Sequence, residues 1–281
     1  MSKRSEKKRN NKPNKNWISA KTADIEDLYI KSVQCAEAEI DLINQVWKEL
    51  RSKKPTLLRE DFSGSGAVSQ EWIKQSNENT SWCVDLDKRV LSWGKKQAEK
   101  ELTPEQISRI FWRTEDVRFV QKEKVDTVLA MNFSYFLFKT REELKEYFVS
   151  VYKNLKDGGL FLLDAYGGAD SHREMEEERD LDGFTYVWDQ SVYDPITSNV
   201  VNHIHFRFPD GSSLDKAFTY DWRLWSLQEI KEILKESGFE KVVFYWEGTD
   251  EESEEGNGEW HQATVGEACD AWVAYIVALK K

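Results

Sequence analysis

The chain has 281 residues, of which 40% are hydrophobic and 12 are Trp, so it can bury a substantial core and is not a disordered polypeptide. Its formal net charge is −11, but residues 1–22 carry eight Lys or Arg side chains against one Glu, which leaves the rest strongly acidic. An acidic body repels a phosphate backbone and therefore disfavours nucleic acid as a partner.

Targeting signals and cysteines limit the class of protein further. No apolar run reaches the roughly 18 residues that a membrane-spanning helix needs, and the basic N-terminus lacks the apolar segment of a signal peptide. We therefore expect a cytoplasmic protein without a membrane partner. Cys35, Cys83 and Cys269 are far apart and odd in number, which predicts reduced thiols rather than a disulfide or a metal site.

The first half of the chain predicts a tail and then an alternating fold. Residues 1–22, rich in Lys, Asn and Ser, predict a disordered basic tail, and the helical spacing of apolar residues over 23–50 predicts two short helices. The predicted strands are 56–60, 82–85, 109–112, 125–131 and 160–164, and the predicted helices between them are 67–75, 88–100 and 142–155. This alternation is typical of parallel strands with crossover helices in a doubly wound α/β sheet.

Residues 170–225 interrupt the alternation. Period-two patterns over 184–191, 200–208 and 214–224, with a turn signal at 209–212, predict an antiparallel β insert. The helix–strand order then resumes. A helix is predicted at 227–237 and strands at 242–246 and 271–279, separated by an acidic solvated loop at 249–259. We therefore predict one α/β domain formed by 23–169 and 226–281, with 170–225 inserted as a substrate or lid region.

Acidic and small residues follow the predicted strands at regular places. Glu60 closes the first strand and leads into the Gly64-Ser65-Gly66 loop and a helix, a pattern typical of nucleoside binding at a sheet edge. Asp85 ends the second strand, at the spacing at which a carboxylate accepts ribose hydroxyls. Asp116 follows the third strand and Asn132 the fourth, at the same edge.

This order of elements and motifs resembles the class I S-adenosylmethionine-dependent methyltransferases over residues 23–281. The resemblance implies a Rossmann-like sheet of seven strands, the last one antiparallel, with S-adenosylmethionine as cofactor. In that family the first acid and the glycines hold the methionine end of the cofactor. The next two acids bind ribose and adenine, and the residue after the fourth strand faces the sulfonium. The cofactor-binding residues implied are Glu60, Phe62, Gly64, Gly66, Asp85, Leu86, Asp116, Val117 and Asn132, with Tyr29 as a candidate lid residue.

One residue departs from the family pattern, and one other class of protein shares the same motifs. Phe62 stands where most members have Gly, which bears on how closely the backbone approaches the cofactor. A nicotinamide-binding Rossmann domain shares the same motifs, but it would also require Gly at this position and a sixth parallel strand. The final helix, strand, loop and strand therefore favour the methyltransferase.

The methyl acceptor is predicted over the fourth and fifth strands, beneath the insert. Candidate catalytic residues are Asn132, Tyr135, Tyr166 and His203, and further candidate wall residues are His205, Tyr220, Trp222, Arg223 and Trp225. Aromatic walls suit a flat or cationic substrate, although Trp and Phe also form cores. His203 and His205 lie two apart on a strand, but without a third ligand they indicate a structural pair or one proton acceptor, and we predict no metal site.

The implied activity is methyl transfer to a small molecule that offers an amine, a hydroxyl or a thiol. An RNA or protein methyltransferase recruited through the basic tail is one alternative, and a non-catalytic cofactor-binding regulator is another. The acidic body and the lack of a recognisable RNA-binding module favour the small-molecule acceptor.

Overall fold

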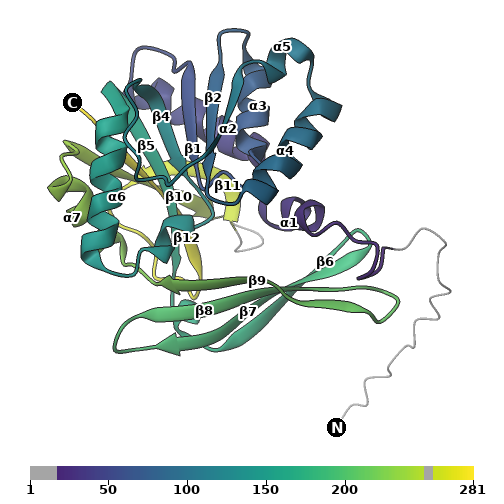
Figure 1. Cartoon of the computed structure of the whole chain (residues 1–281). Coiled ribbons are helices and arrows are strands. Elements are labelled where there is room, and N and C mark those ends of the chain that lie inside the picture. Colours follow the sequence, from purple (N-terminus) through teal and green to yellow (C-terminus); the bar gives the residue numbers. More distant parts are fainter. Residues whose placement is uncertain (1–17, 250–255) are drawn as a thin grey trace.

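The computed structural model describes residues 18–249 and 256–281, which form two β-sheets stacked edge to face (Figure 1). A large sheet flanked by helices lies above a smaller sheet formed by the insert. No helix in these two described ranges is long and apolar enough to cross a membrane.

The large sheet has eight strands in the order β11-β10-β12-β5-β4-β1-β2-β3. Their bounds are β1 Leu57–Asp61, β2 Thr80–Asp85, β3 Ile110–Thr114, β4 Val125–Ala130, β5 Leu155–Gly167, β10 Lys241–Thr249, β11 Gly256–Ala263 and β12 Trp272–Leu279. Strands β1 to β5 are parallel, and β12 runs antiparallel between β5 and β10. The predicted α/β fold with a final antiparallel strand is therefore confirmed.

Strand β11 is the difference from the predicted seven strands. It occupies part of the segment predicted as a solvated loop at 249–259, of which residues 250–255 lie outside the described residues. It pairs with β10 alone, and most of its side chains are exposed. An edge strand open to solvent needs no alternation of apolar residues, so the sequence carried no signal for it.

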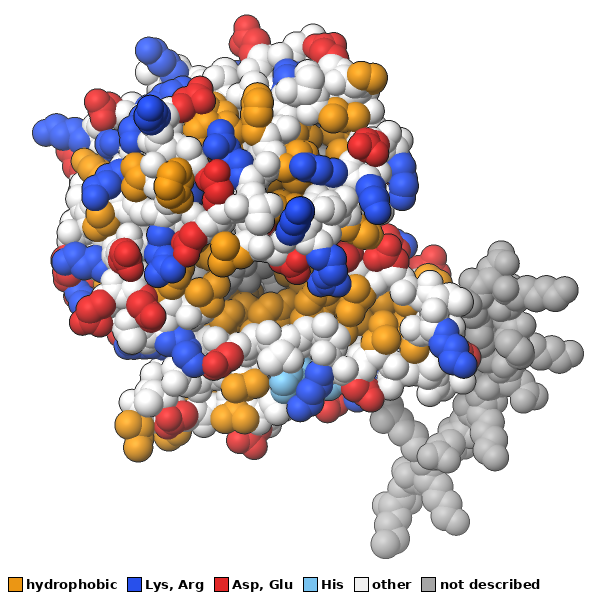
Figure 2. Space-filling model, in the orientation of Figure 1, with side chains coloured by type: hydrophobic (Ala, Val, Ile, Leu, Met, Phe, Trp, Pro, Cys, Tyr) orange, Lys and Arg blue, Asp and Glu red, His pale blue; other side chains and the backbone are white. Residues whose placement is uncertain are grey.

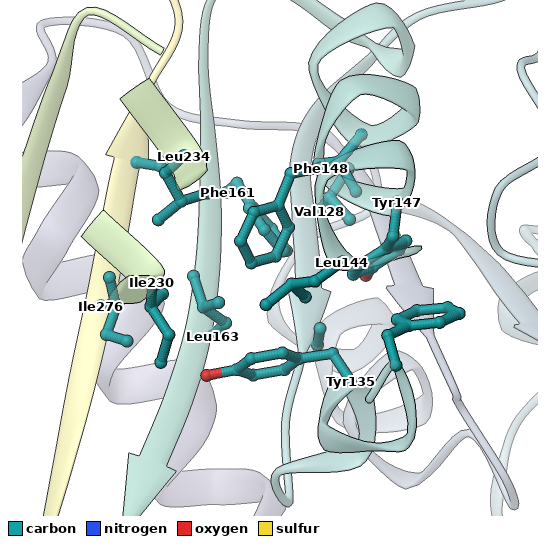
Figure 3. Close-up of a cluster of buried hydrophobic side chains, with 14 of the residues drawn as sticks. Val128, Tyr135, Leu144, Tyr147, Phe148, Phe161, Leu163, Ile230, Leu234 and Ile276 are labelled. Carbon is teal, nitrogen blue, oxygen red and sulfur yellow. The ribbon is translucent and has the colours of Figure 1, made fainter. Parts of the chain in front are cut away.

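Seven helices occur among the described residues; most of them cover the two faces of the large sheet, whereas α1 lies between the two sheets (Figure 1). They are α1 Ile25–Val33, α2 Ala36–Leu50, α3 Ala67–Gln75, α4 Lys88–Glu101, α5 Pro104–Ile107, α6 Arg141–Asn154 and α7 Leu227–Glu236 among the described residues, with short 3-10 turns η1 Ser134–Leu137 and η2 Asp170–His172. Successive residues of β5 serve opposite faces: Phe161 packs with α6 and α7, whereas Leu162 packs with α2 and α3. Figure 3 shows the α6–α7 side, where Phe161, Leu163 and Tyr135 meet Leu144 and Ile230.

The insert forms a four-stranded antiparallel sheet in the order β6-β7-β8-β9, below the edge at which β1, β2 and β4 end (Figure 1). Its strands are β6 Met175–Leu181, β7 Phe184–Asp194, β8 Asn199–Arg207 and β9 Ser213–Arg223. Three of these were predicted. Strand β6 was missed because it is an edge strand of mostly exposed polar residues, so its sequence shows no apolar alternation.

The last residues of the predicted tail are ordered on the insert sheet. Residues 1–17 of the predicted disordered tail lie outside the described residues, but residues 18–22 form a turn. Ile18 and Ala20 pack against the apolar cluster of the insert sheet, and the Ala20 N–H donates to Ser212 Oγ at 3.0 Å. The predicted boundary at residue 22 is therefore too late, because these apolar side chains have a surface to cover.

Candidate functional site

The loop from β1 to α3 carries the first predicted motif in a left-handed backbone. Phe62, Gly64 and Gly66 all have positive φ, at 55°, 51° and 67°. Gly66 is obligatory, because a Cβ there would lie 2.8 Å from both Cys83 Sγ and the Trp112 ring. Phe62 takes the conformation that Gly usually supplies and packs its ring on Tyr147, at 5.5 Å between centroids. The unusual residue thus keeps the loop geometry and adds an aromatic anchor.

Two carboxylates tie this loop to the sheet. Asp85, at the end of β2, accepts from the Gly64 N–H and the Asp87 N–H, both at 2.8 Å. Glu60 is buried at the end of β1 and accepts from the Ser69 N–H of α3 at 2.9 Å, and burial raises its pKa to about 7. Asp85 therefore faces the edge of the sheet, whereas Glu60 anchors the start of α3 from below.

A cleft of about 260 Å³, which we call the outer cleft, opens above this loop. Five of the predicted cofactor residues line it: Tyr29, Phe62, Gly64, Asp85 and Asn132. The sequence did not assign Glu26, Ser65, Asp87, Arg89 or Tyr220 to the cofactor, yet these also line it. Helix α1 contributes Glu26 and Tyr29, so the N-terminal helical unit is a wall of the cleft.

The remaining predicted cofactor residues lie elsewhere. Glu60 and Gly66 do not line the outer cleft; Glu60 holds the start of α3, and Gly66 packs against Cys83 and Trp112. The Asp116 carboxylate is bound by Arg118, with Nη2 to Oδ2 at 2.7 Å and Nε to Oδ1 at 3.0 Å, and this partner holds the Asp116 pKa below its ordinary value. Val117 belongs to the core, and Leu86 is 69% exposed. An adenine amino group would have to compete with Arg118 for Asp116.

A second, smaller space continues inward from the outer cleft. This inner cavity of about 110 Å³ shares Tyr29, Asn132 and Tyr220 with the outer cleft. The insert sheet supplies most of its floor, with Tyr186, Trp188, Ile204, Tyr220 and Trp222. In Figure 2 hydrophobic side chains line the hollow between the large sheet and the insert sheet.

The turn after β4 places Asn132 at the junction of the two spaces. Asn132 and Phe133 are both left-handed, with φ of 58° and 57°. Their backbone N–H groups donate to the two carboxylate oxygens of Asp164 on β5, each at 2.8 Å. Asp164 is buried, which raises its pKa to about 7. The carboxylate thus holds a backbone conformation that non-glycine residues rarely adopt.

Three predicted catalytic residues do not line the inner cavity. Tyr135 is fully buried in the core and donates its hydroxyl to the Asp164 carbonyl at 2.7 Å. Tyr166 accepts from Asn202 Nδ2 at 3.1 Å and lines a neighbouring pocket. His203 lies 3.0 Å from Thr219 Oγ1, while its neighbour Ile204 faces the cavity. Since side chains alternate along a strand, His203 points to the opposite face of the insert sheet.

The other predicted wall residues divide in the same way. Tyr220 and Trp222 line the inner cavity, but Arg223 stacks over the Trp225 ring at 3.7 Å in a separate contact. His205 is 3.1 Å from Asp189 on the outer side of the insert sheet. Among residues 18–249 and 256–281, no three His, Cys, Asp or Glu side chains are grouped so that they could hold a metal ion.

The polar groups around the outer cleft fit a cationic ligand with hydroxyls. Glu26, Asp85 and Asp87 line the cleft, and its one basic lining residue, Arg89, already lies 3.3 Å from Glu26 and 3.4 Å from Asp87. Buried polar atoms lack hydrogen-bond partners here, namely Gln34 Oε1, Ser63 Oγ and Ser65 Oγ. S-adenosylmethionine has a sulfonium, an ammonium and a ribose diol, which match these groups. A phosphate-bearing dinucleotide fits these groups less well, because the three carboxylates repel phosphate and Arg89 already lies beside two of them.

The strand order, the antiparallel β12 and the cleft at the ends of β1, β2 and β4 define the class. The chain has the fold of the class I S-adenosylmethionine-dependent methyltransferases, and its sequence is similar to that of a curated methyltransferase. That relative is "Putative methyltransferase YqeM" of Bacillus subtilis (strain 168), which is 25% identical over 183 residues, covering 63% of this chain and 70% of its own. No protein-family model matches the sequence.

Solved structures share the fold at low sequence identity. An S-adenosylmethionine-dependent methyltransferase from Clostridium acetobutylicum superposes with a TM-score of 0.66 and 18% identity, over 91% of this chain and 98% of its own. DesVI of Streptomyces venezuelae has a TM-score of 0.63 and 17% identity, over 92% and 98%. The sugar N-methyltransferase KedS8 from Streptoalloteichus has a TM-score of 0.61 and 15% identity, over 100% and 99%.

Proposed function

We propose that the chain binds S-adenosylmethionine in the outer cleft and methylates a small molecule held in the inner cavity. The observation that carries this proposal is the proximity of the outer cleft and the inner cavity. The cleft at the sheet edge lies beside a cavity walled by the insert, and the two spaces share Tyr29, Asn132 and Tyr220. Several structural neighbours act on small acceptors, among them an amino pentose methyltransferase and a sugar N-methyltransferase.

The chain's residues would divide the work between binding and positioning. Asp85 offers its carboxylate to the ribose hydroxyls, and the loop at Gly64 brings backbone close to the cofactor. When bound, S-adenosylmethionine supplies a methyl group already activated on sulfur. Catalysis then depends on holding acceptor and methyl close, in line and away from water. Asn132, fixed by Asp164, and the walls of the inner cavity are placed to do this.

The small-molecule acceptor is favoured over an RNA or a folded protein by the size of the inner cavity. At about 110 Å³, beneath the insert sheet, it suits a small group or a compact molecule. A regulator without catalysis would need the cofactor site but no acceptor space beside it. Residues 1–17, which carry most of the basic charge behind the recruitment hypothesis, lie outside the described residues.

Calorimetric titration of the full chain with S-adenosylmethionine and S-adenosylhomocysteine tests the cofactor assignment. Asp85→Ala should weaken both affinities by about 1–3 kcal/mol, because it removes an acceptor for the ribose hydroxyls and a support for the loop. Asp182→Ala, in the turn between β6 and β7, is the matched control and should leave both affinities unchanged. Equal affinities for the Asp85 variant and the native chain would remove Asp85 from the site. No binding of either compound would refute the proposed function.

A further inference from the structure

The inner cavity is walled by aromatic rings. Six of its nine lining residues are aromatic, and three of the rings lie close together on the insert sheet. Ring centroids are 4.4 Å apart for Tyr220 and Trp222, and 5.9 Å apart for Trp188 and Tyr220. Ring faces carry negative charge density and attract a cation within about 6 Å of the centroid. A positive group in this cavity would therefore meet several ring faces at once.

The inner cavity offers no positive partner to an anion. None of its nine lining residues is charged. Burying an unpaired carboxylate or thiolate costs free energy, and the negative ring faces would add repulsion. An anionic acceptor is therefore disfavoured in this cavity.

The inner cavity also lacks a proton acceptor. Burial raises the pKa of the phenols of Tyr29 and Tyr220, so they stay protonated. Asn132 is a neutral amide, and Asp164, which holds the Asn132 and Phe133 N–H groups, does not line the cavity. A hydroxyl acceptor needs a base to remove its proton during methylation, whereas a neutral amine already presents a lone pair.

We propose that the acceptor is an amine carried on a flat apolar body, bound with its nitrogen beside Asn132 and its body against the rings of the insert sheet. This inference rests on the proposed function and names the substrate class of the same site. The amine loses its proton to water before the reaction. Its lone pair then forms the new C–N bond as the C–S bond breaks, and the electron pair of that bond stays on sulfur. Sulfur becomes neutral, the methylated nitrogen carries the positive charge among the rings, and its proton passes to water.

The proposal can be tested by binding alone, with the chain saturated with S-adenosylhomocysteine. Three probes of one shape are compared by ligand-observed NMR titration at pH 7.5: benzylamine, benzyl alcohol and benzoate. Glucosamine serves as an amine without an apolar body. Benzylamine should bind about tenfold more tightly than each of the other three, because it alone combines a cation with a flat apolar body. Equal or tighter binding of the alcohol, the benzoate or glucosamine would overturn the inference, and so would the failure of all four to bind.

Matched variants assign the preference to ring faces. Trp188→Leu should reduce the advantage of benzylamine over benzyl alcohol to about threefold or less, since one ring face is lost. Tyr220→Phe keeps its ring and should retain most of that advantage. Trp260→Leu removes an indole that packs on Tyr275 at the far edge of the large sheet, and should change nothing. Loss of the preference in Tyr220→Phe but not in Trp188→Leu would overturn the role of the rings.

These outcomes are distinct from failure of the proposed function. A variant that still binds S-adenosylhomocysteine with native affinity is folded at the site, so its probe affinities are interpretable. If S-adenosylhomocysteine does not bind the native chain, the proposed function fails before the probes are used. If it binds but the amine has no advantage, only the substrate class is refuted.

Discussion

The Asp164 carboxylate is the support on which the position of Asn132 depends, and Asp164→Asn tests it with little change in shape. The carboxylate accepts from the N–H groups of Asn132 and Phe133, each at 2.8 Å. A left-handed conformation costs about 1–2 kcal/mol for each of these two residues. Two hydrogen bonds to a buried carboxylate, worth about 1.5–3 kcal/mol each, can offset that cost.

An amide at position 164 can accept only one of the two hydrogen bonds. At pH 8, above the Asp164 pKa of about 7, the native residue is ionised. The NH2 group of the variant would face the other backbone N–H, so one charged hydrogen bond is lost and a buried donor is left unpaired. We expect the free energy of unfolding to fall by about 2–4 kcal/mol. We also expect the turn to relax and move Asn132. Because a displacement of about 1 Å at a reacting centre can cost about 100-fold in rate, turnover should fall far more than cofactor affinity.

The matched control is Asp126→Asn. Asp126 also accepts from two backbone N–H groups, those of Thr56 at 3.1 Å and Leu57 at 2.9 Å, but at the opposite end of the sheet. This variant should lose stability and keep native turnover per folded molecule. Urea denaturation measures the first quantity, and S-adenosylhomocysteine release with an amine acceptor measures the second. If Asp164→Asn is destabilised like the control but turns over at the native rate, the positioning role of Asp164 is refuted.

Three further predictions concern the loop, the acceptor residue and pH. Gly66→Ala should lower the free energy of unfolding by about 2–4 kcal/mol in urea denaturation, because its Cβ would collide with Cys83 and Trp112. The Cβ of Gly64→Ala meets open space, so this variant should lose only about 1–2 kcal/mol. Equal losses in the two variants would contradict the steric argument. Asn132→Ala should lower turnover more than S-adenosylmethionine affinity, and the reverse pattern would place Asn132 at the cofactor alone. Burial raises the pKa of Asp164 from 3.8 to about 7, so its protonated form is favoured in the folded chain. The stabilising contribution of the protonated Asp164 is therefore present below pH 4 and is lost as pH rises to 7. The free energy of unfolding, measured against pH, should decline less steeply over this range in Asp164→Asn than in the native chain. Parallel profiles of the two proteins would show that Asp164 does not titrate in this range.

The parts of the site that the sequence predicted are those that local chain geometry fixes. Acids and glycines at the ends of parallel strands meet at one edge of the sheet whatever else surrounds them. This is why the order of Gly64, Asp85 and Asn132 along the chain was enough to place all three on the outer cleft. The alternation of strands and helices likewise follows from residue periodicity alone, and the large sheet has the predicted architecture.

The structure departs from the expected arrangement where a residue's surroundings depend on segments distant in the chain. Strands β6 and β11 have few apolar residues because each has a single neighbour and open faces. His203 and Ile204 are adjacent in sequence, and only the stacking of the insert against the large sheet decides that Ile204 faces the cavity. The sequence suggests that the Asp116 carboxylate is available to a ligand, but in the structure it is hydrogen bonded to the side chain of Arg118.

The sequence by itself determined the class of fold, the edge of the sheet at which the outer cleft lies, and several residues of that cleft. It could do so because strand periodicity and strand-end chemistry are local. Only the tertiary structure decided the inner cavity. Tyr29 comes from α1, Asn132 from the turn after β4, and Tyr220 from β9. These segments are far apart in the chain, and they meet because the insert sheet must bury its apolar face against the large sheet and α1, a requirement set by the whole core rather than by any local pattern.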